Sequence, residues 1–144
     1  FDVVSCIGAT WIGDGLIGTL NLLQPGLRNQ HSLLLVGEPY WIENTPEEAY
    51  ACLGNDREVF TTLSGTLERL ESAGLELVEM VLADFHGWDR YEAGQWIAVS
   101  DWLRQHPDDP DASEIRQWYE QSRRNYLAYL RQYFGWGVFV LRPR

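Results

Sequence analysis

The residues with the clearest capacity for chemistry form an acidic and aromatic segment, Glu38-Pro-Tyr-Trp41, directly after the apolar run Leu33-Leu-Leu-Val36. An apolar run without alternation is typical of a strand whose two faces are both covered, as in parallel sheets. In open α/β sheets, ligands bind in the crevice beyond the carboxyl ends of the strands. We therefore predict that Glu38, Tyr40 and Trp41 line a substrate pocket. The alternative is that Glu38 caps a nearby helix and both rings pack into the core.

A second pattern, Gly13-Asp-Gly-Leu-Ile-Gly18, matches the G-x-G-x-x-G fingerprint of dinucleotide-binding proteins. That fingerprint needs a tight turn from strand to helix, whereas the preceding apolar run ends near Ile7, several residues earlier. Asp14 would also bring a carboxylate toward a pyrophosphate. The pattern leaves two interpretations: a dinucleotide-dependent oxidoreductase domain, or glycines that allow close packing in a loop.

Two further groups of residues follow a third apolar run. Asp84, His86 and Asp89 could act as a base or as metal ligands, but no Cys or further His stands nearby, so we predict no metal site. Trp88 and Tyr91 have helical spacing. Such rings belong either to the core or to a pocket wall, and we assign these two to the substrate pocket.

The elements that must position these residues alternate along the chain. Strands are predicted at about 2–7, 31–37, 75–83 and 136–141, with Pro39 ending the second. Helices are predicted around Leu16 to Leu23 and at about 46–53, 57–73, 88–105 and 111–134. This alternation indicates an α/β fold with a Rossmann-like layered sheet. Residues 86–134 form a helical insertion, which serves either as a lid or substrate cap or as a cover for a sheet face.

Composition narrows the classes of partner. The 144 residues favour one domain. A net charge of -10, with no Lys, disfavours nucleic acid and anionic membranes. Cys6 and Cys52 are far apart in the sequence, as expected of reduced thiols in a cytoplasmic protein. No apolar run approaches the length of a membrane span.

Three features follow one another in the sequence: Phe1-Asp-Val-Val4, the turn Pro25-Gly26, and the run from Leu33 to Pro39. Together they resemble the C-terminal half of a class I S-adenosylmethionine-dependent methyltransferase. The resemblance implies that residues 1–144 are a single partial domain, supplying the last four strands of a seven-stranded sheet. The final strand would be antiparallel and inserted between its neighbours. The family's glycine-rich cofactor loop and its ribose-binding acidic residue have no counterpart in this sequence.

The resemblance also implies a function. The full-length protein would transfer a methyl group from S-adenosylmethionine to a small-molecule acceptor, and this stretch alone would be inactive. By the same comparison, Ile7, Gly8, Thr10 and Trp11 would contact the cofactor, while Glu38, Tyr40 and Trp41 would face the substrate. The sequence opens inside a strand, so we expect a longer polypeptide and self-association through the edge of residues 2–7. A non-catalytic acidic interaction domain remains an alternative.

Overall fold

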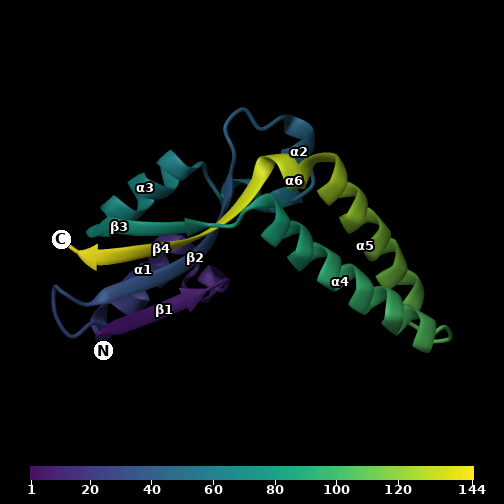
Figure 1. Cartoon of the computed structure of the whole chain (residues 1–144), viewed down its shortest axis with the longest axis horizontal. Coiled ribbons are helices and arrows are strands. Elements are labelled where there is room, and N and C mark those ends of the chain that lie inside the picture. Colours follow the sequence, from purple (N-terminus) through teal and green to yellow (C-terminus); the bar gives the residue numbers. More distant parts are fainter.

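The computed structural model describes residues 1–144 apart from the side chains of residues 55 and 56. Its centre is a sheet of β1 (Val3–Ile7), β2 (Leu33–Trp41), β3 (Leu75–Leu82) and β4 (Phe134–Pro143), in the order β1-β2-β4-β3 (Figure 1). β1 and β2 are parallel, and β4 runs antiparallel to both β2 and β3. The prediction of an antiparallel final strand inserted between its neighbours is therefore confirmed.

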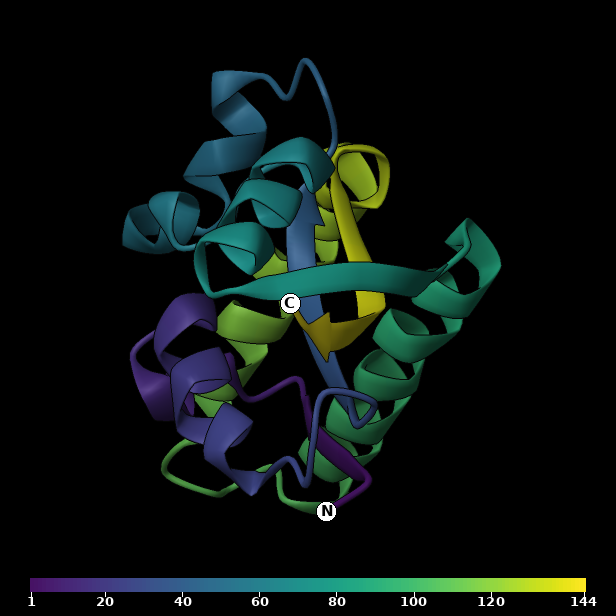
Figure 2. The ribbon, with the colours of Figure 1, turned by 90° about the vertical axis from the view of Figure 1, so that its left-hand side faces the viewer.

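One face of the sheet carries the core. Helices α1 (Leu16–Leu23) and α3 (Leu63–Ser72) lie on the same side of the strands (Figure 2). Their apolar side chains pack against inward-facing strand residues, which alternate along each strand as the pleat requires. The buried cluster consists of Leu16, Leu20, Leu34, Val36, Tyr40, Leu70, Leu75, Phe139 and Leu141.

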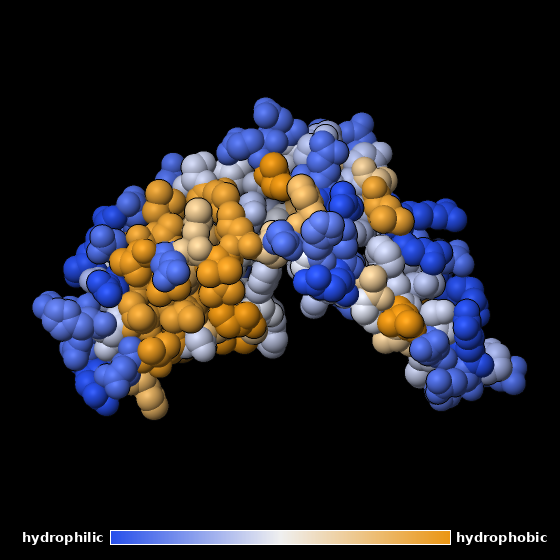
Figure 3. Space-filling view, viewed as in Figure 1, coloured by the Kyte–Doolittle hydropathy of each residue, from blue (hydrophilic) through white to orange (hydrophobic). Residues whose placement is uncertain are grey.

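The opposite face of the sheet is open within this chain. Directly paired residues share a face, and the pairs Val3 with Leu33 and Val81 with Val138 both project away from the helices. Val3, Ile7 and Val81 are each more than half exposed, and Figure 3 shows a broad apolar surface over the strands. The expectation that β2 is covered on both faces was wrong for the described residues, because both helices that pack on the sheet lie on one side.

β2 also continues past Pro39, where the sequence analysis ended it. Its pairing with β4 extends through Pro39 with Trp136 to Trp41 with Phe134. β1 pairs with β2 only as far as Ile7 with Gly37, so beyond that point one edge of β2 has no neighbouring strand. A proline is tolerated there because its missing N–H costs no ladder hydrogen bond on an unpaired edge.

The helices between β2 and β3 are shorter than predicted. α2 spans Glu47–Ala51, and α3 begins at Leu63 rather than at residue 57. Thr62 is the N-cap of α3, since its side chain accepts a hydrogen bond from the N–H of Gly65. Just before it, the carbonyl of Thr61 accepts a hydrogen bond of 2.8 Å from the N–H of Trp41. Short 3-10 turns complete the connections at Thr10–Gly13, Gln24–Gly26 and Gly54–Glu58.

The predicted helical insertion is a hairpin that projects away from the sheet (Figure 1). It consists of α4 (Phe85–Gln105), α5 (Ala112–Asn125), a π-helical turn (Tyr126–Leu130) and α6 (Arg131–Tyr133). α4 begins three residues earlier than expected because Asp84 caps it, accepting a hydrogen bond of 2.6 Å from the N–H of Gly87. A lid or cap role for this hairpin stays a prediction.

Candidate functional site

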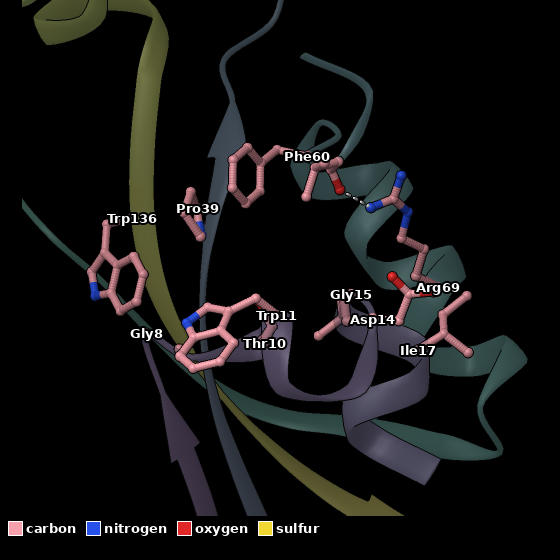
Figure 4. Close-up of a pocket in the computed structure, with 13 residues that line it drawn as sticks. Gly8, Thr10, Trp11, Asp14, Gly15, Ile17, Pro39, Phe60, Arg69 and Trp136 are labelled. Carbon is pink, nitrogen blue, oxygen red and sulfur yellow. Dashed lines mark hydrogen bonds between the residues drawn. The ribbon is translucent and has the colours of Figure 1, made fainter. Parts of the chain in front are cut away.

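The main cavity opens where β1 and β2 end and encloses about 550 Å³ (Figure 4). Its position fits the general rule that ligands bind beyond the carboxyl ends of parallel strands. The wall combines the loop after β1, the start of α1, the end of β2, one residue of β4, and residues of α3 and the segment before it. The lining residues are Gly8, Thr10, Trp11, Asp14, Gly15, Leu16, Ile17, Gly37, Pro39, Val59, Phe60, Arg69 and Trp136.

The loop after β1 supplies three of the four predicted cofactor residues. Gly8 has φ +70°, a conformation that side chains rarely adopt, which explains the glycine where the chain leaves the strand. Thr10 is buried, whereas Trp11 is 77% exposed and holds its indole at the cavity. Ile7 is outside the cavity wall and lies on the open face of the sheet, where it is half exposed.

Glu38 is placed behind this wall rather than in it. Its side chain is only 2% exposed, and its Oε2 accepts a hydrogen bond of 2.7 Å from Thr10 Oγ1. Oε1 has no hydrogen-bond partner among the described residues. Burial raises the pKa of the Glu38 carboxyl above its ordinary value of 4.5, while the Thr10 hydrogen bond and the charge of Arg69 lower it in part. Glu38 therefore reaches the cavity through Thr10.

Two glycines of the G-x-G-x-x-G pattern, Gly13 and Gly18, form a packing contact, whereas Gly15 has a φ of +101° and no close neighbour. Eight residues separate the end of β1 from the start of α1 at Leu16, and they include a 3-10 turn. A Cβ on Gly18 would collide with the carbonyl oxygen of Gly13, and one on Gly13 would collide with the backbone of Thr19. This geometry matches the close-packing interpretation, because the dinucleotide fingerprint requires a direct strand-to-helix turn.

Two of the predicted substrate residues, Tyr40 and Trp88, line a second cavity of about 300 Å³. It is lined by Tyr40, Ile42, Ala83, Asp84, Phe85, Trp88, Arg131, Phe134, Gly135 and Trp136. Tyr91 is not part of this wall, but its ring stacks on Trp88 with centroids 5.3 Å apart. Trp136 lines both cavities, so the two adjoin at its ring.

Trp41 lies apart from both of these cavities. It is 2% exposed, its ring packs against Tyr50 and Phe134, and its indole N–H donates to the carbonyl of Arg57 at 3.0 Å. It borders a third hollow of about 300 Å³ with Tyr50 and Arg57, and this hollow shares Phe60 and Arg69 with the main cavity. These contacts correspond to the alternative in which the ring packs into the core.

The sequence analysis did not identify several residues that line the main cavity. Phe60 and Arg69 belong to the segment around α3, far along the chain from the loop after β1, and no local spacing indicated that they would meet it. Arg69 donates to the carbonyls of Val59 at 2.6 Å and of Glu58 at 3.3 Å, which fixes its guanidinium beside the cavity. Trp136 lies in β4, and the alternation of side chains along that strand did not indicate which face of the sheet borders a cavity.

Asp84 and Asp89, which the sequence analysis considered as a base or metal ligands, have structural partners at the start of α4. Asp84 caps α4, and Asp89 forms an ion pair with Arg131 and accepts a hydrogen bond of 2.8 Å from Tyr126. The hydrogen bonds from Arg131 and then Tyr126 hold the pKa of Asp89 below its usual value. Among the described residues, no group of three or more His, Cys, Asp or Glu side chains is placed to hold a metal ion. No helix in the described part is long and apolar enough to cross a membrane.

Solved structures of two methyltransferases resemble this chain in both sequence and fold. The chain is 45% identical to a SAM-dependent methyltransferase from Geobacter sulfurreducens crystallised with S-adenosyl-L-homocysteine, with a TM-score of 0.89 over 99% of this chain and 58% of that one. A SAM-dependent methyltransferase from Thiobacillus denitrificans, also with S-adenosyl-L-homocysteine, is 40% identical with a TM-score of 0.88, over 99% of this chain and 58% of the other. The chain thus has an α/β fold of the class I methyltransferase kind.

A further relative is the uncharacterized protein YjhP of Escherichia coli (strain K12), 43% identical over 145 residues, which cover 99% of this chain and 58% of YjhP. The X-ray structure of YjhP superposes with a TM-score of 0.90. The chain matches no protein-family model. It spans somewhat more than half the length of the relatives that it matches.

Proposed function

We propose that this chain is the later part of a methyltransferase domain, and that the full-length protein transfers a methyl group from S-adenosylmethionine to a small-molecule acceptor. The observation that carries the proposal is the main cavity at the ends of β1 and β2. Gly8, Thr10 and Trp11, assigned to the cofactor from the resemblance, line that cavity. Two relatives at 40% and 45% identity hold S-adenosyl-L-homocysteine, which supports the cofactor.

The residues present fit one side of this cofactor. S-adenosylmethionine, when bound, supplies a methyl group on a positively charged sulfur. Trp11 and Trp136 offer aromatic faces, which attract cations, and Asp14 adds a carboxylate to the same wall. The buried Oε1 of Glu38, without a partner among the described residues, adds further negative potential behind Thr10.

The chain would also orient the acceptor and receive its proton. The walls at Pro39, Phe60 and Trp136 would limit how an acceptor can lie in the cavity. Thr10 lines the cavity and donates its hydroxyl proton to Glu38, so its oxygen can accept a hydrogen bond from a protonated nucleophile. The raised pKa of Glu38 makes it a stronger base than an exposed carboxylate, and the pair could relay a proton away from the acceptor.

The open sheet face supports the partial-domain part of the proposal. Val3, Ile7 and Val81 form an exposed apolar surface with the half-buried Leu35 and Val140 (Figure 3). A contiguous apolar surface over a sheet is costly in water and is normally covered. Further chain of the full-length protein would cover this face and complete the cofactor site. The free thiols Cys6 and Cys52 are in keeping with a cytoplasmic location.

Calorimetry tests the proposal directly. S-adenosylmethionine should bind the full-length protein and should show no measurable binding to these 144 residues alone. Absence of binding to a folded full-length protein would refute the methyltransferase assignment. Tight binding by the shorter chain would refute the divided cofactor site. A parallel titration with NADH, followed by Trp fluorescence, should give no signal.

A further inference from the structure

The main cavity contains a positive charge that no described carboxylate neutralises. Arg69 lies on the second turn of α3 and lines this cavity. Side chains on a helix lean toward its N-terminus, so the guanidinium of Arg69 reaches back to the segment before α3. There its Nη1 donates to the carbonyl of Val59 at 2.6 Å and its Nη2 to the carbonyl of Glu58 at 3.3 Å. Carbonyl groups carry no net charge, so these bonds position the guanidinium without neutralising it.

Arginines at the neighbouring cavities are paired with carboxylates. Arg57 forms an ion pair with Glu47 at 2.7 Å, and Arg131 forms one with Asp89 at 2.8 Å. Arg69 forms no ion pair with a carboxylate that the structure describes. Arg69 is therefore the arginine of these described walls whose charge is available to an anion from solution.

The hydrogen-bonding capacity of Arg69 is also only partly used. A guanidinium presents several N–H donors in a flat fork, and two of them at Arg69 donate to carbonyls. Its Nε–H donates to none of the described residues. A carboxylate can accept parallel hydrogen bonds from such a fork, and charge-assisted bonds of this kind are roughly twice as strong as neutral ones.

The rest of the main cavity suits an apolar body with one negative charge. Trp11, Phe60 and Trp136 supply aromatic walls. Figure 4 shows Arg69 and Trp136 on opposite sides of the cavity. Asp14 also lines the wall, and its carboxylate would repel a doubly charged phosphate more strongly than a singly charged carboxylate.

The position of Arg69 favours the acceptor over the cofactor. The residues assigned to the cofactor lie in the loop after β1, whereas α3 adjoins the end of β2. The carbonyl of Thr61, just before α3, accepts a hydrogen bond from the N–H of Trp41 on β2. The end of β2 is the segment that the resemblance assigns to the substrate.

We propose that Arg69 determines acceptor specificity by binding a carboxylate, so that the methyl acceptor is a carboxylic acid with an apolar body. The assignment of this carboxylate to the acceptor rests on the proposed function.

The test compares benzoate with benzamide, a neutral molecule of nearly the same shape, by ligand-observed NMR titration of the full-length protein without cofactor. Charge-assisted hydrogen bonds should make benzoate bind about tenfold more tightly than benzamide. Arg69→Gln should abolish this preference, and Arg69→Lys, which keeps the charge but loses the fork, should retain part of it. Arg116→Gln, the same change of charge at an exposed position of α5, should leave it intact. Equal binding of the two probes, or an unchanged preference in Arg69→Gln, would overturn the proposal.

A second readout covers the case in which Arg69→Gln does not fold. The Nε–H resonance of Arg69 in the wild type, assigned with Arg69→Lys, should shift on addition of benzoate and stay in place with benzamide. A resonance that ignores benzoate would overturn the proposal.

Calorimetry with S-adenosylmethionine separates the acceptor from the cofactor, which carries a carboxylate of its own. Arg69→Gln should not weaken binding of S-adenosylmethionine to the full-length protein. A loss as large as that for benzoate would assign the carboxylate site to the cofactor and overturn the proposal. The benzoate titration contains no methyl donor, so failure of the carboxylate site and failure of the methyltransferase assignment give different results.

Discussion

Thr10 and Glu38, 28 positions apart in the sequence, meet in a buried hydrogen bond of 2.7 Å from Oγ1 to Oε2. The bond joins the loop after β1 to β2 at the ends of two parallel strands. It connects a carboxylate that is 2% exposed with the wall of the main cavity. Stability and acid–base behaviour of the site therefore depend on the same pair.

Thr10→Val should destabilise the protein by about 1–3 kcal/mol, because Glu38 would lose its observed hydrogen-bond donor while remaining buried. Urea unfolding at neutral pH measures the change. Thr10→Ser keeps the hydroxyl and serves as the control, with a much smaller loss. Equal losses in the two variants would show that the methyl group of Thr10, and not the hydrogen bond, matters.

Glu38→Gln should change how stability depends on pH. Burial raises the pKa of Glu38 in the folded state above 4.5, so between 4.5 and the raised value the folded state binds more protons than the unfolded chain. The wild type should therefore lose stability relative to Glu38→Gln as the pH rises through this window, with a constant difference below and above it. Parallel pH profiles of the two proteins would contradict the raised pKa.

Trp11→Ala should weaken binding of S-adenosylmethionine to the full-length protein about tenfold, since a cation over an aromatic face gains about 1–2 kcal/mol. Stability should change by less than about 0.5 kcal/mol, because the side chain is 77% exposed. Calorimetry and thermal unfolding give the two values. Trp118→Ala, also exposed but outside the cavity, should alter neither.

Gly135→Ala should destabilise the protein by about 1–3 kcal/mol through overpacking. A Cβ at this position would lie 2.6 Å from Cε2 and Oη of Tyr40, so the ring would have to leave the wall of the second cavity. Gly94→Ala on α4 is the control, because its Cβ would meet open space and a helix favours alanine. Thermal unfolding compares the pair, and a neutral Gly135→Ala would refute the close contact.

The edge of β1 should make the 144-residue chain self-associate. β1 ends the sheet in this chain and leaves a row of unpaired backbone groups beside an exposed apolar face. Sedimentation velocity should show concentration-dependent association that Val3→Lys reduces. Leu127→Lys, 61% exposed on the π-helical turn, should not reduce it. A monomer at high concentration would contradict this prediction.

The sequence predicted those features that local patterns govern. Continuous apolar runs predicted the strands, and their order with the resemblance predicted the antiparallel strand inserted between β2 and β3. The resemblance also assigned Gly8, Thr10 and Trp11 to the cofactor, and the loop that contains them lines the main cavity. Helix starts were less accurate, since a cap such as Thr62 competes with nearby capping sequences and packing decides between them.

The tertiary structure alone decided what each site residue contacts. Glu38 lies behind Thr10, and Trp41 packs in the core. Arg69 and Trp136 line a cavity that their local sequence did not indicate. The tertiary structure also left one face of the sheet open and stacked the indoles of Trp88 and Trp136 at the wall of a second cavity. The physical reason is that periodicity fixes which side of an element is apolar, whereas distances between elements depend on packing among segments far apart in the chain.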